Sequence, residues 1–107
     1  MAKTAHSLYF LGFFICFIVS FSCVKGKTWC VAQVGAPKDR LNAFINEVCP
    51  HLACGPIRRG GKCFEPDNAY NHGSYALNLN YRFNGQCDLS FATLAVTDPS
   101  FLGCHYP

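Results

Sequence analysis

The chain carries eight cysteines in 107 residues, and their positions leave few folds open to it. Two of them lie in an apolar segment near the N-terminus. The other six are spread over the rest of the chain: Cys30, Cys49, Cys54, Cys63, Cys87 and Cys104. An even number of cysteines in a short exported chain is typical of a disulfide framework, whose pairing the spacing alone leaves open. We therefore expect a small domain held together by three disulfides.

The N-terminal residues predict a cleaved signal peptide. Lys3 supplies a positive charge, residues 8–21 form an apolar run of 14 residues, and small residues precede a cleavage position after Gly26. A membrane anchor is the alternative, but 14 helical residues reach only about 21 Å, short of the ~30 Å hydrocarbon core. We predict a signal peptide at 1–26, and a single secreted, extracellular domain at 27–107.

Charge and composition exclude several classes of partner. Removing the predicted signal takes away two lysines and lowers the formal net charge from +3 to +1, which favours neither nucleic acid nor an anionic membrane. Residues 101–107 lack the hydrophobic tail of a glycolipid anchor, so we expect no membrane anchor. Zinc held by Cys49, Cys54 and His51 is the alternative to disulfides, but an oxidising export route disfavours free thiolates. We expect no metal or other cofactor.

Hydrophobic spacing predicts a mixed α+β fold. Apolar residues spaced i, i+3, i+4 and i+7 predict a helix over 38–48, which Pro37 can start. A second helix is expected over 71–83, with its cap at or beside Asn71, its stop at Gly85, and Ala76, Leu79 and Phe83 facing inward. Residues 28–33, which are rich in β-branched and aromatic residues, predict one strand of an antiparallel sheet, and we expect further strands at 87–90 and 93–97.

The segment from Cys54 to Cys87 contains the densest run of tyrosine and asparagine in the chain. A sugar ring has an apolar face that aromatic rings cover and a rim of hydroxyls that amides and carboxylates pair. The rim candidates are Gln33, Glu65, Asp67, Asn78 and Asn80. The residues that we predict to face a saccharide are Trp29, Tyr70, Tyr75, Asn78, Asn80 and Tyr81. A place in the core is an alternative for Trp29 and Tyr75, and it is the favoured one for Phe83.

The same residues do not form a reaction centre. Glycoside hydrolysis needs two carboxyls facing each other across a cleft, whereas Glu65 and Asp67, the closest acidic pair, lie on a loop beside a proline. The basic loop 58–62 lacks the serine or threonine of a phosphate-binding loop, because Cys63 stands in that place. We predict that the chain is not an enzyme and that loop 58–62 is solvated.

A series of short motifs runs through the domain in register with the cysteines. They are Trp29-Cys30-Val31-Ala32, Gly60-Gly61-x-Cys63-Phe64-x-Pro66, His72-x-Ser74-Tyr75-Ala76-x-Asn78, Asn84-Gly85-x-Cys87, Asp98-Pro99-Ser100 and Cys104-x-Tyr106. This pattern resembles the plant X-eight domain, also called carbohydrate-binding module family 43. The match covers essentially all of residues 28–107.

The resemblance implies a small fold with two helices, a short antiparallel sheet and the disulfides Cys30–Cys87, Cys49–Cys54 and Cys63–Cys104. It also implies binding to β-1,3-glucan such as callose, either as a lone module, expected to be a monomer, or beside a separate glucanase. Three departures from the family pattern bear on glucan affinity. Gly73 replaces the usual alanine and loosens the helix start, and residues 80–82 read Asn-Tyr-Arg in place of Tyr-Tyr-Gln. After Cys87, residues 90–92 read Ser-Phe-Ala where the family usually has Gly-Thr-Ala or similar. The alternative function is a small secreted defence protein or ligand that acts through a protein receptor.

Overall fold

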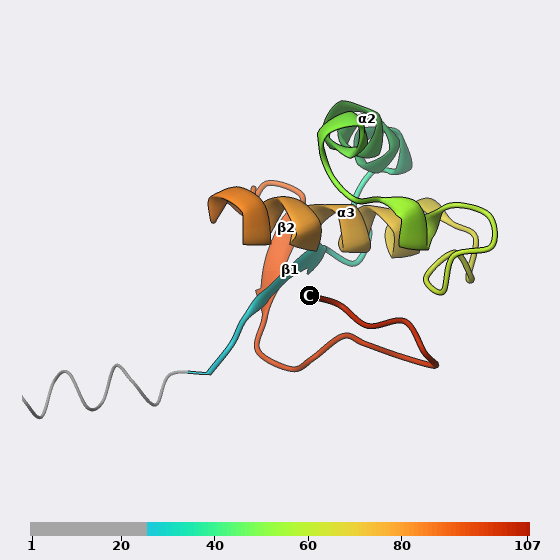
Figure 1. Ribbon diagram of the computed structural model, residues 1–107. Helices are drawn as coiled ribbons and strands as arrows, with labels where there is room; N and C mark the ends of the chain where they lie inside the picture. The colour runs from blue at the N-terminus through green and yellow to red at the C-terminus, as the bar shows by residue number, and fades with distance from the viewer. Residues whose placement is uncertain (1–25) are drawn as a thin grey trace, which may run out of the picture.

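A computed structural model describes residues 26–107, and nearly all of the predicted signal peptide lies outside them, so that segment remains a prediction. The elements in chain order (Figure 1) are strand β1 Trp29–Ala32, helix α2 Lys38–Val48, the 3-10 turns η1 Cys49–His51 and η2 Gly55–Ile57, helix α3 Ala69–Asn84 and strand β2 Ala92–Ala95. The predicted α+β class with two helices and a short antiparallel sheet is confirmed. Over residues 26–107, neither helix is long and apolar enough to cross a membrane.

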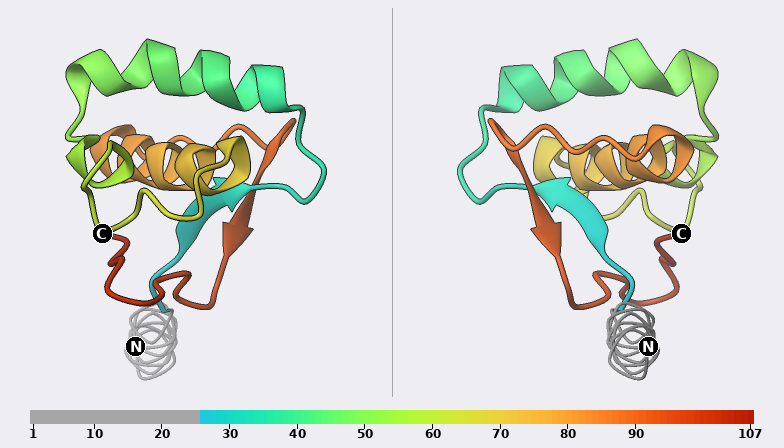
Figure 2. Two further views of the ribbon diagram at one scale, coloured as in Figure 1. Left: turned by 90° about the vertical axis from the view of Figure 1, so that its right-hand side faces the viewer. Right: turned by 90° about the vertical axis from the view of Figure 1, so that its left-hand side faces the viewer.

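Helix α3 is the central layer of the fold. Figure 2 shows α2 on one side of α3 and the two strands on the other. A helix covered on two sides buries more than one stripe of its surface, and here eight of the 16 residues of α3 are buried. Phe83 nevertheless lies 76% exposed, which corrects its predicted inward position. Its ring lies beside the C-terminal end of α2, where it lines a hollow with Glu47, Val48 and His51. The last turn of α3 projects beyond the sheet (Figure 1).

The sheet consists of β1 and β2 in antiparallel register, with Trp29 opposite Ala95 and Ala32 opposite Ala92. The strand predicted over 87–90 is wrong, because Asp88 organises a turn there. Its side chain accepts hydrogen bonds from the backbone and hydroxyl of Ser90, and its carbonyl accepts one from the N–H of Ala92. Short aspartate turns of this kind compete with strand formation.

The other edge of β1 is closed by polar side chains of α3 rather than by a third strand. The N–H of Ala32 donates to Oγ of Ser74 at 3.0 Å, and the N–H of Cys30 donates to Oδ1 of Asn78 at 3.1 Å. Ser74 and Asn78 are four residues apart and therefore lie one above the other on the same helix face. Buried backbone N–H groups require partners, and these two side chains supply them.

The ends of α3 have ordinary capping geometry. Asn68, not Asn71, is the N-cap, and its side chain accepts a hydrogen bond from the Asn71 N–H at 2.7 Å. The Asn71 amide instead donates to the carbonyls of Cys63 and Pro66, which fastens the preceding loop to the helix. At the other end Gly85 adopts a left-handed conformation with φ 75°, as predicted for the stop.

Gly73 marks the closest approach of α3 to α2, so its role is not to loosen the helix. A methyl group added there would lie 2.8 Å from Cδ2 and 3.1 Å from Cβ of the buried Leu41. Gly73→Ala is expected to lower the unfolding free energy by about 1 kcal/mol, because overpacking costs roughly 1–3 kcal/mol while alanine gains at most about 1 kcal/mol in helix propensity. Urea unfolding measures the change.

A double-mutant cycle with Leu41→Ala provides the control for Gly73→Ala. Shortening Leu41 removes the atoms that the new methyl group meets, so the alanine at 73 should cost less in that background. A more stable Gly73→Ala single variant would show that the Leu41 side chain moves aside at little cost.

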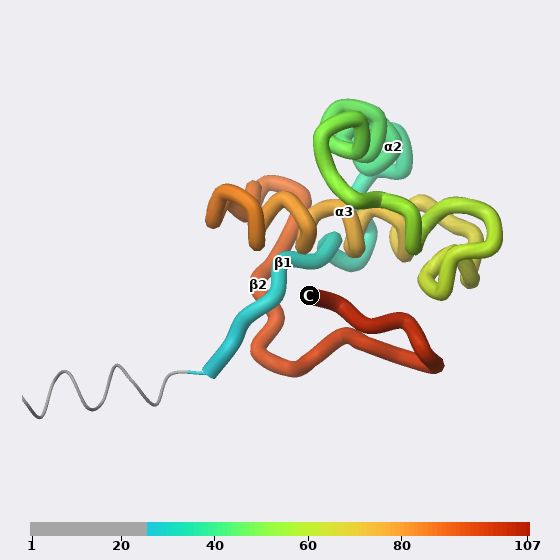
Figure 3. The backbone as a smooth tube through the Cα atoms, viewed as in Figure 1, coloured from blue at the N-terminus to red at the C-terminus, as the bar shows by residue number. Residues whose placement is uncertain are grey.

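The three disulfides pair as the family resemblance implies: Cys30–Cys87, Cys49–Cys54 and Cys63–Cys104. The pairing of Cys49 with Cys54 fixes the chain where it leaves α2 and removes both sulfurs from the zinc alternative. The Cys63–Cys104 bond ties the C-terminal segment, which follows β2 and turns back on itself (Figure 3), to the loop that precedes α3.

Candidate functional site

Three of the six residues that the sequence predicts to face a saccharide are buried. Trp29 is 7% exposed, Tyr75 is 6% exposed and Asn78 is fully buried at 0%. Trp29 and Tyr75 pack in one apolar cluster with Tyr106, while Asn78 closes the edge of β1. The prediction that Asn78 faces ligand is therefore corrected: its helix face is polar because the strand edge needs an acceptor.

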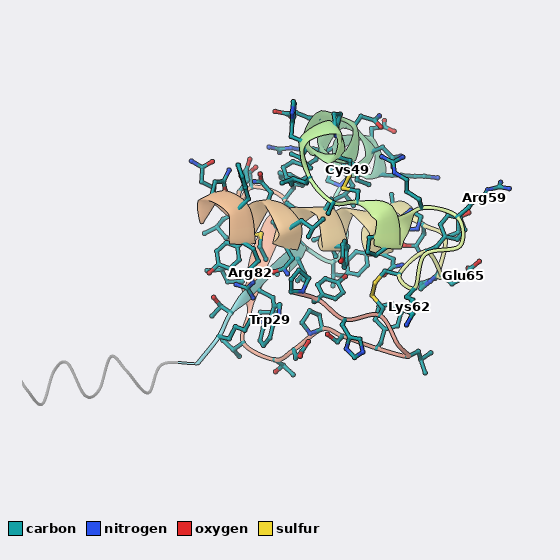
Figure 4. The ribbon with its side chains drawn as sticks, in the orientation of Figure 1. Trp29, Cys49, Arg59, Lys62, Glu65 and Arg82 are labelled. Carbon is teal, nitrogen blue, oxygen red and sulfur yellow. A yellow bond between two sulfur atoms is a disulfide. The ribbon has the colours of Figure 1, made fainter. Side chains whose placement is uncertain are left out.

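Tyr81 and Trp29 lie around the beginning of β1. The Tyr81 hydroxyl shares a hydrogen bond of 2.6 Å with Oγ1 of Thr28, and Nη2 of Arg82 donates to the Thr28 carbonyl at 2.6 Å. The Arg82 guanidinium also lies over the Trp29 ring, 5.9 Å from its centroid (Figure 4). These contacts fasten the strand to the end of α3, and Tyr81 remains half-buried.

Tyr70 and Tyr75 come from the first half of α3 and lie near Tyr106. The rings of Tyr75 and Tyr106 meet edge to face with centroids 5.2 Å apart, and Tyr70 is 46% exposed. Burial raises the pKa of Tyr75. Burial also raises the pKa of Tyr106, and the neighbouring Tyr70 and Tyr75 add to that increase. The structure thus separates the predicted tyrosines into two groups, which do not form a single wall.

Three adjoining hollows form a groove between α2, the second half of α3 and the turn before β2. Their volumes are about 290, 300 and 240 Å³, and neighbouring hollows share lining residues. We call this surface the α2–α3 groove. Its principal lining residues are Arg40, Phe44, Glu47, Val48, His51, Asn80, Phe83, Asn84, Gln86, Asp88 and Phe91. Asn80 is the one residue of the predicted set among them.

The α2–α3 groove combines aromatic rings with amides. Phe83 presents an exposed ring at one end, and the half-buried Phe44 packs edge to face on Phe91, with centroids 5.7 Å apart, at the other. Between them, the Asn84 amide donates to Oδ1 of Asn80 at 3.3 Å. Asn84 also accepts a hydrogen bond from the N–H of Gln86 at 2.9 Å, which holds these amides in a row.

Carboxylates complete the rim of the α2–α3 groove. Asp88 lies 3.4 Å from Nη2 of Arg40, and the Arg40 guanidinium covers the Phe91 ring at 4.4 Å from its centroid. Hydrogen bonds from the side chain and backbone of Ser90, with a smaller contribution from Arg40, lower the pKa of Asp88. A general acid for glycoside hydrolysis needs a raised pKa, so Asp88 suits hydroxyl binding rather than proton donation.

A separate hollow of about 350 Å³ lies between the loop that contains η2 and the C-terminal segment. We call it the glycine pocket. It is lined by Gly55, Pro56, Gly60, Gly61, Lys62, Cys63, Tyr75, Gly103 and His105. The Cys63–Cys104 disulfide joins its two walls, and Figure 4 shows Lys62 on the loop side.

Sequence reasoning missed most of the α2–α3 groove because a groove between two helices depends on how they cross. Phe83 fits the inward stripe of α3 by spacing, yet it lies at the end of the groove beside α2 and is largely exposed. One available signal was the polar run after Phe83, where Asn84, Gln86 and Asp88 follow one another at alternate positions. Such a run beside an exposed ring is a reasonable marker of a saccharide rim.

Comparison with known proteins agrees with this architecture. A family model of the X8 domain matches residues 28–92. The chain is 42% identical over 86 residues to a glucan endo-1,3-beta-D-glucosidase of Olea europaea, and the aligned region covers 75% of this chain and 19% of the glucosidase. It is 37% identical over 86 residues to plasmodesmata callose-binding protein 2 of Arabidopsis thaliana, and the aligned region covers 75% of this chain and 44% of that protein.

A third relative is similar to this chain over most of its own length. It is the major pollen allergen Ole e 10 of Olea europaea, 39% identical over 88 residues that cover 75% of this chain and 71% of the allergen. By contrast, the matched region spans about a fifth of the glucosidases it resembles. No solved structure matches the chain. The family match covers more than half of the sequence, and the chain belongs to the X8 domain family.

Proposed function

We propose that this protein is a non-catalytic module that binds β-1,3-glucan of the callose type in the plant cell wall. The observation that carries the proposal is the lining of the α2–α3 groove, which combines an exposed and a half-buried phenylalanine ring with amides and carboxylates. A relative whose name states callose binding supports the choice of glucan. We further propose that the chain acts outside the cell as a monomer after loss of residues 1–26, alone or beside a separate glucanase.

The shape of the α2–α3 groove favours a chain of sugars over a single sugar. Hollows that share Glu47, Val48 and Asn80 at one junction, and Phe44, Glu47 and Asp88 at the next, offer consecutive places along one direction. Rings cover the apolar faces of successive sugars, and the amide row pairs their hydroxyls.

The predicted residues take different parts in this proposal. Asn80 contacts the glucan directly as a member of the amide row. Tyr70 and Tyr81 keep part of their surface accessible and serve as outer contacts for a longer polymer. Trp29, Tyr75 and Asn78 support glucan binding in the groove only through the fold, because they are largely buried and none of them lines the groove.

A pull-down on insoluble β-1,3-glucan, with cellulose as the control polymer, tests the function. The protein should be retained by β-1,3-glucan and pass over cellulose. Retention by neither polymer would overturn the proposal and favour the alternative of a ligand for a protein receptor. Release of reducing sugar from the glucan would contradict the non-catalytic part alone.

Phe83→Ala tests the groove itself. Removing this ring should weaken binding to a soluble β-1,3-glucan about tenfold, because truncating an anchoring aromatic residue costs on the order of 1–2 kcal/mol. Titration calorimetry measures the affinity. Phe83 is 76% exposed, so thermal unfolding should hardly change.

Val96→Ala is the matched control, since Val96 is 81% exposed just after β2 and does not line the groove. Its affinity for the glucan should equal that of the unmodified protein. Equal affinity in the Phe83 variant would place the glucan elsewhere on the molecule.

A further inference from the structure

The glycine pocket has walls made largely of backbone. Four of its nine lining residues are glycines, and methyl groups added at Gly55, Gly60 or Gly103 would meet no atom within 4 Å. Gly61 is different, because a methyl group there would overlap the backbone of Gly55 and Pro56. There is therefore free space beside three of the glycines, whereas Gly61 packs directly against the backbone of Gly55 and Pro56.

The rim of the glycine pocket carries the positive charge of Lys62. His105 also lines the pocket and no aspartate or glutamate does, although Asp98 lies near enough to His105 to interact with it electrostatically. Arg58 and Arg59 belong to the same loop, with Arg59 pointing away from the fold in Figure 4. Glu65 follows on the adjoining loop, but within residues 26–107 neither it nor another acid forms an ion pair with these cations.

The interior of the glycine pocket is mostly apolar. The Tyr75 ring, the Cys63 end of its disulfide and Pro56 provide its surface. A bare inorganic anion would leave this surface unused, and a neutral apolar ligand would leave the cations unpaired. A ligand that fits both parts has a ring with an apolar face and an anionic group at its edge.

We propose that the glycine pocket binds a uronate residue of an acidic polysaccharide. The sugar ring lies towards Tyr75, glycine backbone approaches its hydroxyls closely, and its carboxylate pairs with Lys62. The glycine pocket shares no lining residue with the α2–α3 groove. One domain thus has separate sites for an acidic and a neutral polysaccharide, and the failure of one assignment leaves the other standing.

Titration calorimetry with an oligogalacturonate tests this assignment, with its methyl ester as the uncharged ligand of the same backbone. The purified protein should bind the acid at least about tenfold more tightly than the ester, because esterification removes the charge-assisted hydrogen bonds. In nuclear magnetic resonance spectra, the acid should shift the amide signals of Gly60, Gly61 and Gly103 rather than those of Asn80 and Gln86.

Lys62→Gln and Lys38→Gln form a matched pair of variants. Both remove one exposed lysine and change the net charge equally, but Lys38 lies at the start of α2 and lines none of the described hollows. Lys62→Gln should weaken binding of the oligogalacturonate by at least about fivefold, and Lys38→Gln by less than about twofold.

Three results would overturn the proposal. If the protein did not bind oligogalacturonate, the proposed uronate site would be wrong. Equal losses in the two lysine variants would mean a general attraction between a basic surface and a polyanion. Displacement of the oligogalacturonate by inorganic phosphate at equal concentration would mean a simple anion site in which the sugar ring has no part.

Discussion

Replacing Asn78 with leucine is expected to lower the unfolding free energy by about 2–3 kcal/mol. Leucine is close to asparagine in size but has no acceptor, so the N–H of Cys30 loses the Oδ1 partner that it has at 3.1 Å and remains buried. Leaving a buried donor unsatisfied costs roughly 1–3 kcal/mol, and the edge of β1 also loses one of its two hydrogen bonds to α3 side chains. For a domain of this size the melting temperature should fall by about 10 °C.

Asn46→Leu provides the control for Asn78→Leu. It makes the same exchange in the middle of α2, where the side chain is exposed and makes no hydrogen bond within residues 26–107. Its stability should change by less than about 0.5 kcal/mol. If the Asn78 variant unfolded at the same urea concentration as the Asn46 variant, the hydrogen bond between α3 and β1 would not be a significant part of the fold.

Removing the Cys63–Cys104 disulfide, by changing both cysteines to alanine, should cost about 3–4 kcal/mol. The bond closes a loop with a sequence separation of 41, and the entropy of an open loop of that length favours the unfolded chain. It also joins the two walls of the glycine pocket. In conditions where this variant stays folded, oligogalacturonate binding should disappear while β-1,3-glucan binding persists.

The matched variant removes the Cys49–Cys54 disulfide, whose sequence separation is only 5. The same reasoning on loop entropy gives a smaller loss of stability for this bond, since a short loop restricts the unfolded chain less. Denaturant unfolding of both variants under non-reducing conditions compares the two losses. Equal losses of stability would contradict the loop-entropy argument. Loss of glucan binding together with loss of the Cys63–Cys104 bond would contradict the separation of the two sites.

Features that depend on neighbouring residues in the chain were accessible from sequence. The spacing of Leu41, Phe44, Ile45 and Val48 gave the bounds of α2, and Gly85 gave the end of α3. The disulfide pairing came from the family resemblance, because spacing alone does not choose among the alternatives.

Features that depend on how the helices and strands pack against one another could not be predicted from the sequence. Asn78 is polar and lies on a helix, so a solvent-facing position was the natural expectation. It is buried because a two-stranded sheet leaves an edge whose N–H groups need acceptors, and α3 lies against that edge. Phe83 shows the opposite case, since an apolar residue at the spacing of a core position is exposed at the end of the groove between α2 and α3.

The double coverage of α3 divides its residues between two tasks that mutation can address independently. Ser74 and Asn78 face the strand and maintain the architecture, whereas Asn80, Phe83 and Asn84 face the groove and leave the backbone pairing alone. A combinatorial library restricted to these groove positions should therefore yield folded proteins with altered polymer preference. The domain is in that sense an adaptable scaffold for affinity reagents directed at wall polysaccharides.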